Sequence, residues 1–258
     1  MANEILCSVH DYIAIVTLNR PEKRNALNET TLQELSATFT TLERCQDVRV
    51  VIIRGAGKVF CSGRDLREMG QRQATGGEKS TVDIVQVFRQ IETSRHPTIA
   101  MVHGDALAGG CELALHCDLR IAAETARFGM PLARLGLVVP FDLGGKLVEI
   151  VGPANTRQLL LTAQPVDGKR ALAMGMVHQV VPATDIEAAT NDLARTIAAN
   201  APLALAGIKA VILRTLSLRE QLAHQDLDAI VDQARRSADA REGVQAMLEK
   251  RQPVFRGV

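Results

Sequence analysis

One segment near the middle of the chain restricts the fold more than any other. Residues 98–102 form a short apolar run with β-branched members, which is typical of a buried strand. A glycine-containing loop, residues 103–110, follows the run and leads into an apolar segment that extends to His116. Strand, glycine-rich loop and helix in this order are typical of an α/β core.

The same order of elements recurs along the chain. β-branched residues predict a hairpin over residues 4–18, around His10 and Asp11. Apolar residues at helical spacing predict a helix from Glu29, before a strand over residues 49–54. A second predicted helix, residues 81–93, precedes the strand at 98–102, and a further strand is expected at 119–122. These elements form repeated units of strands followed by a helix.

Helical patterns dominate after Gly136. The expected helices cover residues 143–150, 154–161 and 168–174, with three more after Pro182. The sequence contains neither a linker nor a repeat of fixed period. We therefore expect one α/β core, residues 1–195, joined to a helical C-terminal region, residues 196–258.

Composition excludes several classes of protein. Hydrophobic residues make up 47% of the 258-residue chain and charged residues 23%, close to the average for globular proteins. The longest apolar runs are far shorter than the roughly 20 residues that span a bilayer. Thirty basic residues balance 29 acidic ones, and neither sign is clustered. We expect a cytoplasmic protein that binds neither membranes nor nucleic acid.

The cysteines predict neither a disulfide framework nor a metal site. There are five, at irregular spacing, so they are expected to be reduced thiols. Cys111 and Cys117 flank a segment that includes His116, but no second pair of ligands lies at zinc-site spacing.

The glycine-rich loop suggests a site for developing negative charge. The first backbone N–H groups of a helix have no partners within the helix and favour an anion. Gly109 supplies one such N–H group and lets a substrate approach the backbone closely. A thioester that becomes an enolate gains negative charge on its oxygen, and a preorganised N–H donor contributes roughly 3 to 4 kcal/mol there.

Glu112 is the best-placed acid or base for this chemistry. It follows Gly109 by about one helical turn, so both residues lie on the same face of the helix. The alternative interpretation is that Glu112 merely stabilises the positive end of the helix dipole.

The earlier glycine-containing loop, residues 60–66, also follows a strand. Its backbone could provide a second donor from Ser62, and two donors would form an oxyanion hole. The alternative is an ordinary turn in which Asp65 caps a short following helix. Ser62 is a weak candidate nucleophile because no Gly-x-Ser-x-Gly motif surrounds it.

Three ordered segments resemble the enoyl-CoA hydratase/isomerase family, also called the crotonase family. They are residues 18–28, 60–66 and 97–118, and the similarity extends from about Ile5 to Arg251. The resemblance implies an α/β, crotonase-like (ClpP/crotonase) fold, in which β-β-α units form a spiral and the C-terminal region is helical. It also implies assembly into homotrimers or dimers of trimers through that region.

The resemblance also implies roles for individual residues. The Ser62 and Gly109 N–H groups would hold the thioester oxygen, and Glu112 would be the first catalytic glutamate. The residues expected to contact the substrate or its coenzyme A portion are Lys23, Arg24, Gly63, Arg64, Asp65, Leu66, Gly110 and Leu132. Coenzyme A is part of the substrate, and no separate cofactor or metal is expected.

One position departs from the family pattern. Hydratases of the family usually carry a second glutamate after the Phe-Gly-x-Pro motif, where this chain has Leu132. Leucine cannot transfer a proton, so ordinary hydration is expected to lose roughly 10² to 10⁴ in rate. The next acidic candidate is Asp142, which is equally expected to cap the helix that starts near Leu143.

The sequence leaves three functions open. The first is double-bond isomerisation or hydration of an enoyl-CoA with Glu112 as the single proton-transfer group. The second is decarboxylation of a malonyl-type CoA thioester, which needs an enolate stabiliser more than two acids. The third is a non-catalytic acyl-CoA-binding protein. The polar segment 70–80 is expected to help cover the site.

Overall fold

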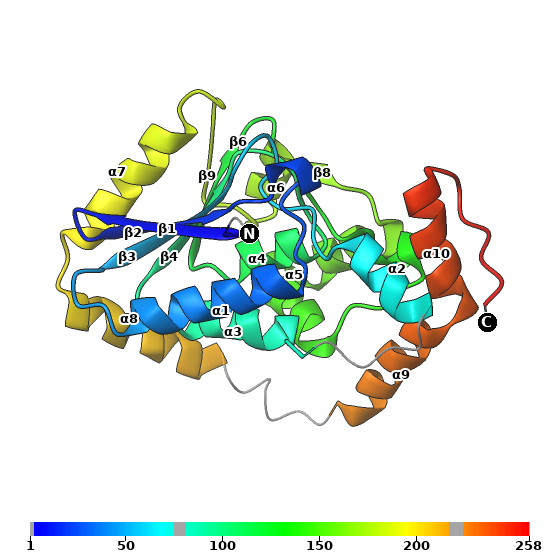
Figure 1. Cartoon of the computed structure of the whole chain (residues 1–258). Coiled ribbons are helices and arrows are strands. Elements are labelled where there is room, and N and C mark those ends of the chain that lie inside the picture. Colours follow the sequence, from blue (N-terminus) through cyan, green and yellow to red (C-terminus); the bar gives the residue numbers. More distant parts are fainter. Residues whose placement is uncertain (1–2, 75–80, 217–223, 258) are drawn as a thin grey trace.

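The strands form two sheets in a computed structural model that describes residues 3–74, 81–216 and 224–257. The larger sheet has the order β1-β2-β3-β4-β6-β9 (Figure 1), and the smaller has the order β5-β7-β8. The larger sheet contains β1 (Ile5–His10), β2 (Ile13–Leu18), β3 (Val50–Gly55), β4 (Thr98–Val102), β6 (Leu119–Ala123) and β9 (Gln179–Val181). The smaller contains β5 (Ala106–Leu107), β7 (Arg127–Gly129) and β8 (Val166–Asp167).

The chain enters the larger sheet through the hairpin predicted from the sequence. β1 and β2 are antiparallel, and Asp11 and Tyr12 form the turn with φ of 48° and 65°. All further neighbours in this sheet are parallel. The loops after β3 and β4 therefore leave the sheet at the same edge, where sites of α/β proteins commonly lie.

Helices fill the connections between strands. They are α1 (Glu29–Glu43), α2 (Leu66–Ala74), α3 (Ile84–Thr93), α4 (Gly109–Leu115), α5 (Phe141–Thr162), α6 (Gly168–Ala173), α7 (Ile186–Ala198), α8 (Pro202–Leu216), α9 (Gln225–Arg236) and α10 (Ala238–Glu249), with short 3₁₀ turns η1 (Pro21–Lys23) and η2 (Pro131–Leu135). The successive units β4-β5-α4 and β6-β7-α5 follow the predicted β-β-α order. The two helices expected at 143–150 and 154–161 are the halves of α5, which is interrupted by non-helical Gly152 before Pro153.

Alternation along the strands places the larger sheet between two apolar layers. In β3, Val51 and Ile53 belong to the cluster beneath α1, α3 and α4. Val50 and Ile52 face the opposite cluster, which includes residues of α7. Period-2 alternation of this kind is what a strand covered on both faces requires. Figure 1 shows α1 and α3 below the strands and α7 above them.

The C-terminal region differs from the expectation in two respects. Four helices follow Pro182 among the described residues, where three were predicted. The expected boundary at residue 195 falls inside α7, and Ile197 and Ala198 of this helix belong to the core. The core therefore continues through α7, and the break before Pro202 separates it from α8.

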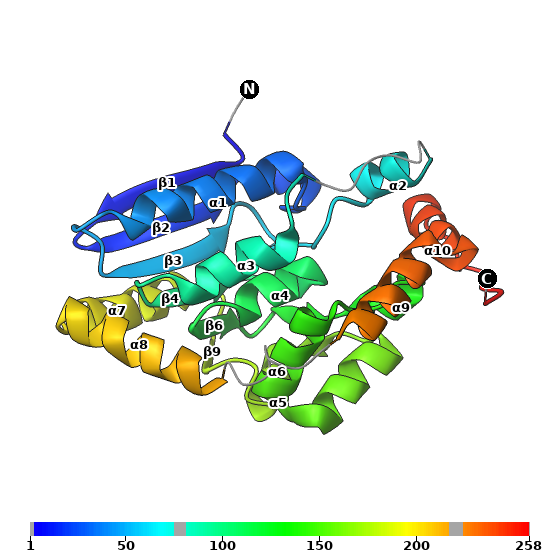
Figure 2. The ribbon, with the colours of Figure 1, turned by 90° about the horizontal axis from the view of Figure 1, so that it is seen from below.

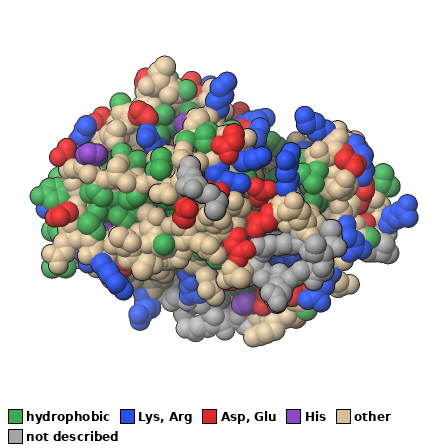
Figure 3. Space-filling view, viewed as in Figure 1, with side chains coloured by type: hydrophobic (Ala, Val, Ile, Leu, Met, Phe, Trp, Pro, Cys, Tyr) green, Lys and Arg blue, Asp and Glu red, His purple; other side chains and the backbone are tan. Residues whose placement is uncertain are grey.

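Helices α7 and α8 lie at one end of the molecule, and α9 and α10 lie at the other (Figures 1 and 2). No single described helix is long and apolar enough to span a membrane. The bent pair of α7 and α8 passes that test together, by length and composition only. Acidic and basic side chains are interspersed on the face in Figure 3.

Helix α10 packs on α2 and η2. Helix α2 covers the first part of the polar segment 70–80, and the segment beyond residue 74 lies outside the described residues.

Candidate active site

Helix α4 begins at a sharp change in backbone direction. Ala108 precedes it with φ of 48° and ψ of −123°, and the Ala108 N–H donates to the Gly129 carbonyl at 2.8 Å. Gly109 is the first residue of the helix and is partly exposed. Among the described residues, the Gly109 N–H makes no hydrogen bond to a backbone carbonyl outside its helix. This donor is therefore placed as the sequence predicted, at the partly open start of α4.

The loop after β3 packs against the start of α4, backbone to backbone. The Cys61 N–H donates to the Asp105 carbonyl at 3.1 Å, and the Cys61 carbonyl accepts from the Leu107 N–H at 3.0 Å. A Cβ atom on Gly110 would lie 2.1 Å from the Cys61 oxygen. Gly63 has φ of +90°, and its Cβ would lie 2.9 Å from that of Ala108. Because neither glycine position has room for a side chain, the two loops hold a fixed spacing.

Ser62 is not available as the second donor, which corrects the assignment made from the sequence. Its backbone N–H already donates to the Arg24 carbonyl at 3.1 Å. The backbone nitrogen of Arg64, two positions later, lies beside Gly109 instead: a Cβ atom on Gly109 would be 3.7 Å from it. Arg64 is therefore the better-placed residue of this loop for contact with an atom held at Gly109.

A buried asparagine, which the sequence did not single out, ties the loop at residues 19–28 to this arrangement. Asn25 is 1% exposed, and its side-chain amide donates to the Ala56 carbonyl at 2.9 Å and to the Val59 carbonyl at 2.7 Å. Its Oδ1 atom accepts from the Arg20 N–H at 3.0 Å. Each such bond contributes about 1 kcal/mol. Asn25 thus fixes the position of the neighbouring Arg24 carbonyl.

Glu112 belongs to the first turn of α4 and has no exposed surface. Neither carboxylate oxygen has a hydrogen-bond partner among the described residues. Burial raises the pKa of Glu112 well above its ordinary value, and nearby Lys146 lowers it in part. A carboxylate that only stabilised the helix dipole would be expected to reach water or an N–H group. The dipole alternative therefore does not account for this side chain, which is a fully buried carboxyl group with no hydrogen-bond partner among the described residues.

Comparisons with known proteins agree with this geometry. The model of the enoyl-CoA hydratase/isomerase family matches residues 9–258. The chain belongs to this family. The short-chain-enoyl-CoA hydratase of Clostridium acetobutylicum is 35% identical over 250 residues, covering 96% of each chain.

Two solved structures extend the comparison. Methylmalonyl-CoA decarboxylase in complex with 2-nitronate-propionyl-CoA is 30% identical, covers 99% of both chains and has a TM-score of 0.87. Carnitinyl-CoA hydratase from Mycobacterium avium is 31% identical, covers 100% of both chains and also has a TM-score of 0.87. The expected crotonase-like fold is confirmed.

The position at which hydratases of the family usually carry their second glutamate lies in η2. Leu132 is half-buried there and packs against the larger apolar cluster. Its carbonyl accepts from the Leu137 N–H at 3.0 Å. The leucine therefore contributes apolar surface at this position and no proton-transfer group.

Asp142 does not have the capping role considered for it. Helix α5 starts at Phe141, its N-cap residue is Pro140, and no side chain caps it. Asp142 is exposed in the first turn, and Arg134 is exposed in η2. A catalytic role for Asp142 stays a prediction from the sequence, and its exposure on this chain does not favour one.

The basic residues expected near coenzyme A lie on the surface. Lys23 and Arg24 are exposed, and the Arg24 guanidinium is 3.0 Å from the buried Asp105 carboxylate. Arg127, which the sequence did not single out, binds the same carboxylate through two bonds of 2.9 and 2.8 Å. These ion pairs hold the pKa of Asp105 below its usual value. Two exposed guanidinium groups therefore lie side by side around one buried carboxylate.

Asp65 has the structural role that was its alternative interpretation. Its Oδ1 atom accepts from the Arg67 N–H at 3.1 Å in the first turn of α2, and Oδ2 lies 3.3 Å from the Arg20 guanidinium. Leu66, the first residue of α2, is half-buried. Contact of either residue with coenzyme A stays a prediction.

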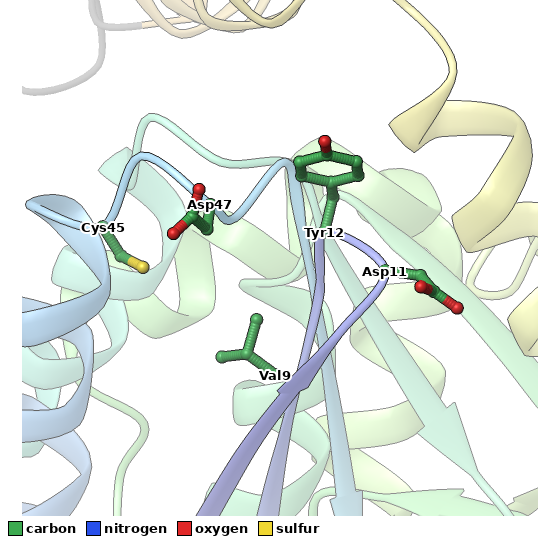
Figure 4. Close-up of a pocket in the computed structure, with 5 residues that line it drawn as sticks. All are labelled: Val9, Asp11, Tyr12, Cys45 and Asp47. Atoms are coloured by element: carbon green, nitrogen blue, oxygen red, sulfur yellow. The ribbon is translucent and has the colours of Figure 1, made fainter.

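A hollow elsewhere on the surface is not part of this site. It has a volume of about 530 Å³ and is lined by Val9, Asp11, Tyr12, Cys45 and Asp47 (Figure 4). The hollow lies at the β1–β2 turn, near the starts of the parallel strands, whereas α4 begins beyond the end of β4. None of the residues that the sequence assigned to chemistry lines it.

Proposed function

We propose that the protein stabilises the enolate of an acyl-CoA thioester and uses Glu112 as its single proton-transfer group, to isomerise or hydrate an enoyl-CoA. The observation that carries this proposal is the complete burial of Glu112, which has no hydrogen-bond partner among the described residues, one turn from the partly exposed Gly109. The backbone N–H groups of Gly109 and Arg64 would donate hydrogen bonds to the thioester oxygen. Glu112 would exchange a proton with a carbon of the acyl group.

The missing second carboxylate shapes the expected reaction. A single acid or base suffices for double-bond isomerisation, because one group can remove a proton and return it at another carbon. Hydration also needs a group that activates water, and Leu132 cannot do this. Similarity to the Clostridium acetobutylicum hydratase supports an enoyl-CoA as substrate. We therefore expect isomerisation to be faster than hydration.

Purified protein should be mixed separately with crotonyl-CoA and a 3-enoyl-CoA while the absorbance of the conjugated thioester is followed. Isomerisation increases this absorbance with the 3-enoyl-CoA, and hydration decreases it with crotonyl-CoA. Glu112→Gln should abolish either change. Absence of both changes with the wild-type protein would refute this proposal.

Decarboxylation of a malonyl-type CoA thioester is a second candidate. Loss of carbon dioxide from such a substrate leaves an enolate. One oxyanion hole can stabilise this enolate, and one proton donor can protonate it to give the product. The raised pKa of Glu112 suits a donor, and Leu132 is no obstacle. The similarity to methylmalonyl-CoA decarboxylase favours this candidate. Release of carbon dioxide from methylmalonyl-CoA, without activity on either enoyl-CoA, would establish it over isomerisation.

A non-catalytic acyl-CoA-binding role is the third possibility. Calorimetry that shows binding of these thioesters without turnover of any would favour it. Lys23, Arg24 and the neighbouring Arg127 are the basic residues proposed for the coenzyme A phosphates. We propose that the protein needs no cofactor besides the coenzyme A carried by its substrate.

We further propose that the protein is a cytoplasmic homotrimer, or a dimer of trimers, that acts in fatty acid metabolism. Exposed apolar residues along α8 support assembly, because a lone chain would leave them in water. They are Leu203, Ile208, Val211, Ile212 and Leu216. Analytical ultracentrifugation would measure the assembly, and a monomer at micromolar concentration would contradict it.

A further inference from the structure

A buried ammonium group lies on α5, the helix that packs against the helix of Glu112. Lys146 of α5 is 8% exposed, and its Nζ atom is 2.6 Å from Glu92 Oε1 on α3 and 2.7 Å from Glu149 Oε1 on its own helix. Burial of lysine requires pairing, and two carboxylates supply it. The ammonium is thereby held in one position between α3 and α5.

This cluster lies next to the helix that carries Glu112. Helix α5 packs against α4, and Lys146 interacts electrostatically with the Glu112 carboxylate. The charges of all three cluster residues also affect the pKa of the buried His116 at the end of α4. The Nδ1 atom of His116 lies 2.8 Å from the Glu112 carbonyl oxygen. The cluster therefore lies on a helix that packs against the helix of Glu112, the buried carboxylate among the described residues whose oxygens have no hydrogen-bond partner.

We propose that Lys146, held by Glu92 and Glu149, is a positioning residue that sets how readily Glu112 gives up its proton. The catalytic meaning of this role rests on the proposed function, but the electrostatic effect does not. A positive charge close to a buried carboxyl group favours its ionised form and lowers its pKa. Lys146 favours the ionised form of Glu112, whereas its two carboxylate partners weaken that influence.

Few other groups compete for this effect. Cys111 and His116 on α4 are neutral near pH 7, since burial raises the pKa of the thiol and lowers that of the imidazole. Arg120 of β6 is 4% exposed and donates to the Met176 carbonyl at 2.6 Å and the Cys117 carbonyl at 2.5 Å. Its position at the end of α4 is fixed by these bonds. The charge that can be altered without disturbing α4 itself is therefore that of the Lys146 cluster.

The test titrates Glu112 directly, without turnover. Infrared difference spectra of wild type minus Glu112→Gln isolate the protonated carboxyl band, whose loss with rising pH gives a midpoint. Lys146→Met should raise this midpoint by about one pH unit or more, and Lys146→Arg should keep it near the wild-type value. Glu149→Gln should lower it, because Lys146 then retains only Glu92.

Lys209→Met is the matched control. Lys209 is 6% exposed and pairs with Asp118 at 2.7 Å, so this variant also disrupts a buried ion pair. It should leave the Glu112 midpoint unchanged. If Lys146→Met does not fold, the test rests on Glu149→Gln, in which Lys146 keeps one partner. An unchanged midpoint in every cluster variant that folds would overturn the proposal.

The pH dependence of kcat/KM provides a second measurement. For any CoA thioester that is turned over, the limb that reports Glu112 should move with the infrared midpoint. Shifted midpoints in a protein that turns over none of the thioesters would refute the proposed function and leave the role of Lys146 intact. Turnover of a thioester by variants whose Glu112 midpoints do not shift would refute the role of Lys146 and leave the proposed function intact.

Discussion

The molecule buries ionisable side chains in two very different ways. At Lys209 the ammonium donates to Asp118 at 2.7 Å and to the His96 carbonyl at 3.1 Å. Asp118 in turn accepts from the N–H and hydroxyl groups of Thr98 at 2.7 and 2.8 Å. Glu112 is buried at least as deeply, and its carboxylate has no hydrogen-bond partner within the part of the chain that the structure describes. Partnered burial of this kind anchors α8 to the sheet, whereas unpartnered burial costs stability and is expected where a group must react.

The largest effect is expected when the unpartnered group is removed. Glu112→Gln should lower kcat/KM by about 10² to 10⁴, because the amide cannot transfer a proton. The urea midpoint of unfolding should not decrease, since no hydrogen bond is lost. Glu187→Gln, at an exposed glutamate, is the control and should change neither value. A stable Glu112→Gln variant with full activity would show that Glu112 is not the proton carrier.

Removal of the partnered ammonium should lower stability and leave activity unchanged. Lys209→Met leaves Asp118 without its counter-charge and should lower the free energy of unfolding by about 3 kcal/mol. This is the lower end for a broken buried pair, because the Asp118 side chain is 30% exposed. Urea unfolding measures the loss, and kcat/KM of the folded variant should stay at the wild-type value. Loss of activity without loss of stability would contradict the comparison.

The two sites should also differ in their response to pH. Because the pKa of Glu112 is raised in the folded state, its proton stabilises the protein fully below the ordinary value of 4.5. That contribution is lost as pH rises towards the folded value, by about 1.4 kcal/mol per pH unit. Urea unfolding between pH 4 and 8 should therefore show wild type losing stability relative to Glu112→Gln. Parallel curves for the two proteins would contradict the raised pKa.

The smallest effect is expected at an exposed carboxylate. Asp142→Asn should change kcat/KM less than about threefold, because Asp142 lies on the surface of the first turn of α5. Circular dichroism should show the same unfolding temperature within about 1 °C. A loss of 10² or more in kcat/KM would instead establish Asp142 as the second catalytic group.

Much of the fold follows from local patterns. The hairpin of β1 and β2, the strand β4 and the helix α1 were predicted because alternation, helical spacing and turns are written in consecutive residues. Asn28 illustrates this: its side chain caps α1 by accepting from the Thr31 N–H at 2.7 Å. In the site, the loop before Gly109 and the position of Glu112 on its helix were predictable for the same reason.

The remaining features depend on contacts between distant residues. Ser62 was chosen as a donor because nothing near it in sequence indicates that the Arg24 carbonyl accepts its N–H. Pairing of Lys146 with Glu92 joins residues 54 positions apart. The division expected at residue 195 falls inside α7, because the apolar stripe that holds α7 on the sheet continues beyond it. Such outcomes depend on which surfaces meet in the folded chain.

The hydrogen bonds between Cys61 and the strand before α4 have an evolutionary consequence. Both are made by backbone atoms alone, so most substitutions of side chains leave this join intact. Acidic, basic or apolar side chains can therefore be substituted around this join without disrupting its hydrogen bonds. A chain in which a carboxylate residue was replaced by Leu132 would lose a proton-transfer group and keep the backbone arrangement proposed to bind the thioester. Selection for a different product could then begin from a protein that still binds its substrate.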